Sequence, residues 1–183
     1  MDPNQNTNTI ANVSTNPEIT RITITFPTNA YFISGLRDFT LNMIKNTTNF
    51  SEKWAYRFQS VVDELCNNAI EHGSTPGKDV TIVFSYAKDN WLEIEVYDTG
   101  TGPQKISATQ LKDIFTTRSE SGYIFNGIRG RGLAKIVGEW TDEIDFSDIS
   151  NGGLKVRVRK YLNDPRFQDA TQSEQKDLIL SNI

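Results

Sequence analysis

Glu64 and Asn68 lie four residues apart in a segment with helical periodicity, and Asp98 follows about thirty residues later, ahead of Gly100 and Gly102. A carboxylate can accept a proton from a hydroxyl or a water molecule. An amide oxygen is a hard ligand of the kind that magnesium accepts beside its waters. Glycines let the backbone approach a ligand closely. In this order, the residues favour nucleotide and magnesium chemistry.

The helix that contains Glu64 and Asn68 must place both side chains at the edge of its buried face. Val61, Leu65 and Ala69 repeat with a period near 3.6 and define the buried centre. On a helical wheel Glu64 and Asn68 fall together on one flank of that centre, where the wall of a cleft would be. A Glu and an Asn at this spacing are also common on exposed helix faces, so the pair alone has a purely structural interpretation as well.

Asp98 follows a segment that ends in Val96 and Tyr97 and reads as a strand. An aspartate at the end of a strand can accept a hydrogen bond from an exocyclic amine such as that of adenine. An Asp-Thr-Gly sequence is also an ordinary turn, so the loop is informative only in combination with other motifs.

A second glycine-rich run, from Gly127 to Leu133, opens a predicted helix. The N–H groups at a helix N-terminus attract phosphate, and Arg129 and Arg131 can add charge-assisted hydrogen bonds. The alternative is a basic surface turn. The run lacks the Gly-Lys-Ser/Thr of a P-loop, and it lies too late in the chain for a Rossmann fingerprint.

Hydrophobic periodicity predicts strands and helices that alternate along the chain. On the first helix we expect Tyr31, Phe32, Leu36, Phe39, Met43 and Ile44 to point inward, and on the second Trp54, Phe58, Val61, Leu65 and Ala69. Ser51 is the expected cap of the second helix, and Gly73 its end. The expected strands are 19–26, 80–87, 91–97, 143–148 and 154–161, and the expected helices are 29–46, 51–73, 108–115, 132–140 and 170–180.

The chain of 183 residues is long enough for one domain, and its net charge of −4 argues against nucleic acid as a direct ligand. Its single cysteine, Cys66, excludes an internal disulfide, and we expect this side chain to be packed. Its single histidine, His72, is expected to pack or to neutralise a helix C-terminus. The sequence shows neither a leader nor a membrane span, which predicts a cytoplasmic protein. Residues 1–18 are expected to form a disordered arm.

With these three segments in this order, residues 19–162 resemble the GHKL superfamily of ATPases and kinases, and most closely the bacterial anti-sigma factor serine kinases. Glu64, Asn68 and Ala69 match the N box of that superfamily. Asp98, Gly100 and Gly102 match its first glycine box, and Gly130, Gly132 and Leu133 match the second.

The resemblance implies an α+β two-layer sandwich of the Bergerat type, with a mixed, mostly antiparallel sheet and helices on one face. It implies ATP and Mg²⁺ as cofactors, Glu64 as general base, Asn68 as magnesium ligand and Asp98 as adenine contact. The glycines, together with Arg129, Arg131 and a lid over 101–128, would shape the phosphate pocket. The implied partners are a small anti-anti-sigma protein, phosphorylated on serine, and a sigma factor. A homodimer is left open, and 163–183 would form a tail with a short helix.

One position departs from the family pattern. The family often has Gly-Thr where the last strand begins, and this chain has Gly153-Leu154, which removes one hydroxyl contact to the nucleotide. A second hypothesis is therefore a non-catalytic nucleotide-binding module that sequesters a protein partner. A sensor histidine kinase fragment would need a phosphoacceptor histidine on a dimerisation helix, and a gyrase-type ATPase would need a transducer domain. Both fit this chain less well.

Overall fold

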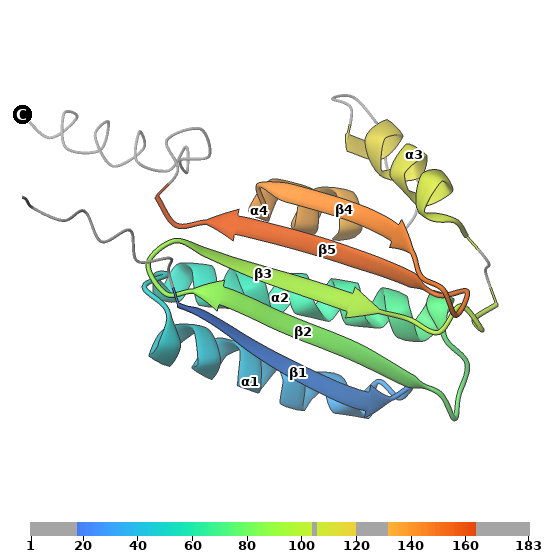
Figure 1. Ribbon diagram of the computed structural model, residues 1–183, viewed down its shortest axis with the longest axis horizontal. Helices are drawn as coiled ribbons and strands as arrows, with labels where there is room; N and C mark the ends of the chain where they lie inside the picture. Colours follow the sequence, from blue (N-terminus) through green and yellow to red (C-terminus); the bar gives the residue numbers. More distant parts are fainter. Residues whose placement is uncertain (1–17, 104–105, 120–131, 164–183) are drawn as a thin grey trace, which may run out of the picture.

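The computed structural model describes residues 18–103, 106–119 and 132–163, and it has two layers (Figure 1). Five strands form one sheet in the order β1-β2-β3-β5-β4. The strands are β1 (Ile19–Pro27), β2 (Asp79–Ala87), β3 (Trp91–Tyr97), β4 (Glu143–Asp148) and β5 (Leu154–Tyr161). The helical elements are α1 (Tyr31–Thr47), α2 (Glu52–Asn68), η1 (Ala69–Gly73), α3 (Ala108–Ser119), η2 (Leu133–Val137) and α4 (Gly138–Trp140).

Helices α1 and α2 lie side by side on one face of the sheet, as Figure 1 shows. The predicted α+β two-layer sandwich is therefore confirmed. All four pairings between the described strands are antiparallel, so the mixed pairing expected from the resemblance is not found among them. Within the described part of the chain, no helix is both long enough and apolar enough to cross a membrane.

The core between the layers comes from the alternating strand residues and from one stripe of each long helix. Strand β2 contributes Val80, Ile82 and Phe84, which are fully buried. Because β2 pairs in register with β3, Ile82 lies opposite Val96 and Phe84 lies opposite Ile94. This alternation explains why the strands over 80–87 and 91–97 were predictable from sequence.

The inward face of α1 differs from the prediction. Tyr31 is 83% exposed and Phe32 is 40% exposed, although both were expected to point inward. Ile33 is buried in their place, as is Thr40, whose hydroxyl donates to the carbonyl of Leu36 at 2.7 Å. A threonine whose hydroxyl bonds to a carbonyl of its own helix can be buried at little cost in free energy. The buried face of α1 therefore includes Thr40, which a search for hydrophobic residues alone does not select.

Helix α2 follows the sequence prediction closely. Ser51 caps it by accepting the Trp54 backbone N–H, and Phe58, Val61, Leu65 and Ala69 are buried, although Trp54 is only half-buried. The regular α-helix ends at Asn68, and the chain continues as a π-helical turn through Gly73. The predicted end is therefore correct, with a wider last turn. Such π-turns are frequent at functional sites.

The sheet face opposite α1 and α2 carries a network of ion pairs. Glu93 accepts hydrogen bonds from Arg157 at 3.0 Å and from Arg159 at 2.7 Å. Glu95 accepts one from Arg21 at 3.0 Å. These side chains come from β1, β3 and β5 and join the strands across that face.

Several predictions concern residues outside the described part of the chain. They are residues 1–17 of the arm expected over 1–18, the helix over 170–180 and the segment 120–131, which contains most of the second glycine-rich run.

Candidate functional site

A cavity of about 920 Å³ opens between α2, the loop that follows β3, helix α3 and the β4–β5 turn. One wall is the C-terminal half of α2 together with η1, and the opposite wall is α3. The floor is the end of β3 and the start of β5. The residues that line it include Glu64, Asn68, His72, Gly73, Val96, Asp98, Thr99, Gly100, Thr101, Ser107, Gln110, Ile114, Phe115, Leu133, Asp148, Leu154 and Val156.

Glu64 and Asn68 both line this cavity, on the flank of α2 that the helical wheel indicated. The Asn68 side-chain Nδ2 donates a hydrogen bond to Glu64 Oε1 at 2.9 Å. Because the amide nitrogen is turned toward Glu64, Asn68 Oδ1 is the atom left over, and it has no hydrogen bond to the described residues. The pair therefore presents one carboxylate oxygen and one amide oxygen that are free to meet a ligand.

Asp98 lies on the floor of the cavity, and its backbone surroundings fix its carboxylate. Oδ1 accepts the backbone N–H groups of Gly100 and Leu154, both at 2.9 Å. Burial raises the pKa of this carboxyl group, and the two N–H bonds oppose that rise. Oδ2 accepts no hydrogen bond from the described residues, so it is the acceptor available to a ligand.

Two glycines make room for these carboxylates. A Cβ on Gly73, at the end of η1, would lie 2.1 Å from Asp98 Oδ2. A Cβ on Gly132 would lie 1.9 Å from Glu64 Oε2. Glycine, which has no Cβ atom, lets the backbone come this close to a carboxylate. The carboxylate of Asp98 therefore lies against the Cα atom of Gly73, and that of Glu64 lies against the Cα atom of Gly132.

The Asp98 loop is also fixed by its glycines and by a cluster of hydroxyl groups. Gly100 has a φ of +61°, and a Cβ there would meet the Gly152 carbonyl oxygen at 1.8 Å. Gly102 donates its N–H to the Gly73 carbonyl at 3.2 Å. The Thr101 hydroxyl lies 2.7 Å from that of Thr99 and 3.0 Å from that of Thr75. The loop is thereby joined to the chain that follows η1.

The structure brings together most of the residues predicted from the motifs. Glu64, Asn68, Asp98, Gly100 and Leu133 line the cavity. Gly102 packs against the His72 backbone just behind it, and Gly132 packs against Glu64. The predicted phosphate contacts Arg129, Gly130 and Arg131 lie outside the described residues, as does the central part of the expected lid.

Leu154, at the position where the family often offers a hydroxyl, lines the cavity with Val96 and Val156 and supplies an apolar floor. Ile114 and Phe115 of α3, within the expected lid over 101–128, supply an apolar wall. Their individual roles were not predicted. The strand residues could have been found from the alternation of β3 and β5. The helix of α3 was expected over 108–115, but no local signal places it against the cavity, because its position depends on contacts with β4.

His72 and Asp148 also line the cavity without having been expected there. His72 was expected to pack or to neutralise a helix end. His72 lies one helical turn after Asn68 on the same flank of the helix, and this spacing could have predicted that it lines the cavity. Asp148 ends a strand distant in sequence from Glu64, Asn68 and Asp98, so only the fold places it beside them.

A magnesium ion fits this set of donors when it is shared with phosphate. Among the described residues, no group of three or more His, Cys, Asp and Glu side chains forms a metal cage. The Asn68 Oδ1 atom, left free by its hydrogen bond to Glu64, offers a single hard ligand. Magnesium usually keeps several waters and is held by one or two protein oxygens with substrate phosphates, which this arrangement allows.

A two-layer fold with a polar helix flank and a glycine-bounded aspartate around one cavity is consistent with an ATP-binding domain of the GHKL class. Residues 26–160, which are more than half of the chain, match the family described as the histidine kinase-like ATPase domain. The chain belongs to this family, so the resemblance to the GHKL superfamily is confirmed and ATP is the ligand that it implies. A search of curated proteins gave no significant match.

Proposed function

We propose that this protein is an ATP- and magnesium-dependent serine/threonine protein kinase of the anti-sigma factor type. In this proposal it phosphorylates a small anti-anti-sigma protein and binds a sigma factor. The observation that supports it most is the hydrogen-bonded pair of Glu64 and Asn68 on the wall of the same cavity as Asp98. A domain that only bound nucleotide would need Asp98, but it would not need the carboxylate of Glu64 beside the magnesium ligand Asn68.

Each polar residue has a distinct task in this reaction. Asp98 Oδ2 accepts a hydrogen bond from the adenine amino group, while the apolar residues of the floor and of α3 enclose the base. Asn68 Oδ1 holds the magnesium ion, which neutralises charge on the phosphate oxygens. Glu64 accepts the proton of the attacking serine hydroxyl. Positioning and electrostatic stabilisation supply most of the rate in phosphoryl transfer.

The experiment compares Glu64→Gln with Glu71→Gln, which changes an exposed glutamate outside the cavity on the following helical turn. Transfer of labelled phosphate from ATP to recombinant anti-anti-sigma proteins is measured at saturating magnesium. We expect the Glu64 variant to bind ATP but to transfer phosphate about 10²- to 10⁴-fold more slowly, as expected for loss of a general base. Equal transfer rates in the two variants would exclude Glu64 as the base.

A second candidate function is a non-catalytic module that sequesters its partner in a nucleotide-dependent way. The observation that favours it is Leu154, which lines the cavity with an apolar side chain at the position where the family often offers a hydroxyl. The two functions are separated by measuring ADP release and phosphate transfer in the same mixture. Partner binding that depends on ATP, without any phosphate on the partner, would support this second function.

A further inference from the structure

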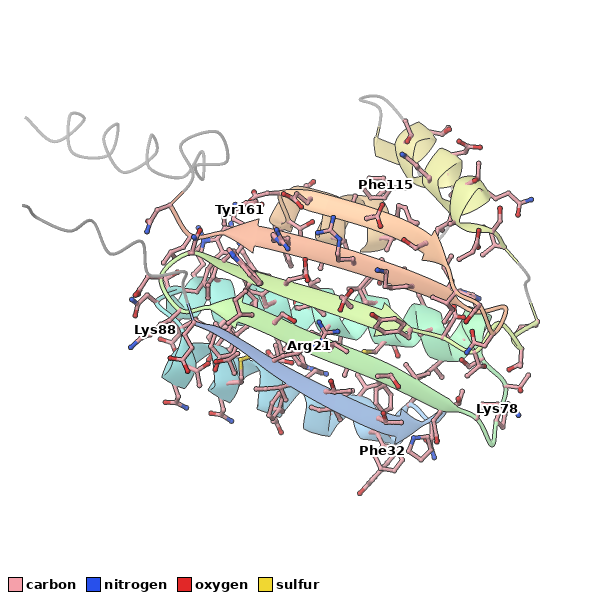
Figure 2. All side chains as sticks on the ribbon, in the orientation of Figure 1. Arg21, Phe32, Lys78, Lys88, Phe115 and Tyr161 are labelled. Atoms are coloured by element: carbon pink, nitrogen blue, oxygen red, sulfur yellow. The ribbon has the colours of Figure 1, made fainter. Side chains whose placement is uncertain are left out.

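Helix α3 forms one wall of the cavity, and its first turn is attached to strand β4. The Ala108 backbone N–H donates to Asp148 Oδ1 at 2.9 Å, across 40 positions of sequence. Near the other end of the helix, Phe115 contacts Phe146 with ring centroids 5.7 Å apart, and Figure 2 shows Phe115 between α3 and β4. Both attachments go to β4.

The first turn of α3 is otherwise capped locally. The Ser107 hydroxyl accepts the Gln110 backbone N–H at 3.2 Å, and the Gln110 side chain accepts the Ser107 backbone N–H at 2.9 Å. This reciprocal pair satisfies two of the donors that a helix N-terminus leaves open. The Ala108 N–H is a further open donor, and it is satisfied from a different part of the fold. The bond to Asp148 therefore joins the first turn of the helix to β4, whereas the local pair only caps the helix.

Asp148 is also linked, through Leu154, to the carboxylate on the cavity floor. Asp148 pairs with Leu154 in the β4–β5 ladder. The Leu154 N–H donates to Asp98 Oδ1, and the Leu154 carbonyl accepts the Asp98 N–H at 3.0 Å. The path from the helix to the floor thus consists of three adjacent contacts.

The turn between these strands is held by its own hydrogen bonds and packs against the Asp98 backbone. The Ile149 N–H donates to the Gly153 carbonyl and the Gly152 N–H donates to the Ile149 carbonyl, both at 2.9 Å. The Gly153 N–H donates to the Asn151 side chain at 3.1 Å. A Cβ on Gly153 would lie 2.3 Å from the Asp98 carbonyl oxygen, so the turn is packed against the aspartate backbone.

We propose that Asp148 is a positioning residue of the nucleotide site, which attaches α3 to the hairpin that holds Asp98. The α3 wall and the adenine-contacting carboxylate are then set at a fixed separation by one structural unit. The attachment stands on the contacts above, and its effect on ATP affinity rests on the proposed function. Asp148 touches no reacting atom in this proposal and acts through Ala108.

The attachment is tested in nucleotide-free protein by amide hydrogen exchange over 108–115. Asp148→Ala removes the acceptor, while Asp148→Asn keeps an oxygen that can accept the same N–H. Asp145→Ala is the matched control, because Asp145 lies on the same strand and accepts from Ser147 instead of α3. We expect about three- to tenfold faster exchange in Asp148→Ala, as for one lost hydrogen bond, and near wild-type exchange in the other two variants.

The link to the cavity floor is tested with Asp98→Ala in the same nucleotide-free assay. Loss of the Asp98 carboxylate should also speed exchange over 108–115, whereas Glu64→Gln should not. Equal exchange over 108–115 in wild type, Asp148→Ala and Asp98→Ala would overturn the proposal. Because no nucleotide is present, this result is independent of whether the protein is a kinase.

The consequence for the nucleotide is a rise of about three- to tenfold in the KM for ATP of Asp148→Ala, with kcat within twofold of wild type. If that variant fails to fold, Ala108→Pro removes the donor instead, and proline is well tolerated at the first position of a helix. The two substitutions should not add when combined, because they break the same bond. Additive effects, or an unchanged KM in either folded variant, would contradict the positioning role.

Discussion

Gly132 lies against the carboxylate of Glu64, so closely that a Cβ on the glycine would stand 1.9 Å from Glu64 Oε2. The two residues are far apart in sequence, and their contact joins the N-terminal end of η2 to the wall of the cavity. The clashing atom is the far end of a flexible side chain, so an added methyl group would displace the carboxylate without unfolding the domain. This contact explains why a glycine is needed at this point of the second glycine-rich run.

Gly132→Ala is therefore expected to retain the fold and lose activity. A displacement of the Glu64 carboxylate by about 1 Å can cost on the order of 10²-fold in rate. We expect kcat for phosphate transfer to fall by about that factor, with the melting temperature close to wild type. Gly35→Ala in α1 is the control, since a Cβ there meets no atom within 4 Å. A kcat equal to wild type would show that Glu64 tolerates the displacement or is not the base.

ATP binding should depend on the protonation of Asp98. Burial raises the pKa of this carboxyl group, so protonation begins at a higher pH than for an ordinary aspartate. In the proposed function the ionised carboxylate accepts a hydrogen bond from the adenine amino group, so the affinity for ATP should fall as the pH is lowered through the raised pKa. Calorimetric titration with ATP between pH 4 and pH 8, at about unit steps, measures this. Asp98→Asn should bind ATP more weakly and lose that pH dependence.

The same pKa shift predicts the sign of a stability effect. A carboxyl group whose pKa is raised in the folded state binds more protons folded than unfolded. The stability that Asp98 contributes is thus fully present below its unfolded pKa and is lost as the pH rises through its folded pKa. The difference in unfolding free energy between wild type and Asp98→Asn, measured by urea titration across that range, should follow this direction. A difference that does not vary with pH would contradict the raised pKa.

Glu93→Ala is expected to destabilise the sheet without changing nucleotide binding. Glu93 is buried on the face opposite α1 and α2 and accepts bonds from both Arg157 and Arg159. Its removal leaves two guanidinium groups without this acceptor, which we expect to cost about 1–3 kcal/mol because the arginines remain partly solvated. Urea unfolding measures the loss, and the Kd for ATP should stay within twofold. Glu52→Ala, which breaks the exposed pair with Lys45, should cost less.

Cys66 should be unreactive in the native protein. The side chain is fully buried in α2, and burial raises the pKa of its thiol to about 12. Alkylation requires the thiolate, so iodoacetamide at pH 8 should label the folded protein only as fast as it opens. Mass spectrometry in the absence and presence of urea checks this. Rapid labelling of folded protein would show that α2 is not packed as described.

The sequence by itself determined the elements and the chemistry of the site residues. Helix α2 was predictable to its cap, because Ser51 and the stripe from Phe58 to Ala69 are local signals with a helical period. The flank that holds Glu64 and Asn68 followed from the same period. The motifs gave the residue types that a nucleotide site needs. The inward face of α1 was predicted wrongly at Tyr31 and Phe32, because large aromatic side chains were expected to be buried. The buried face instead includes the polar residue Thr40.

Only the tertiary structure decided which of these residues meet. The contact of Asp98 with Leu154 depends on strand register, and that of Glu64 with Gly132 depends on how η2 packs against α2. The attachment of α3 depends on where the end of β4 places Asp148 relative to Ala108. None of these contacts is visible in local sequence, because hydrophobic periods fix which face of an element is buried, whereas sheet pairing and close backbone packing fix which distant residue lies across from it.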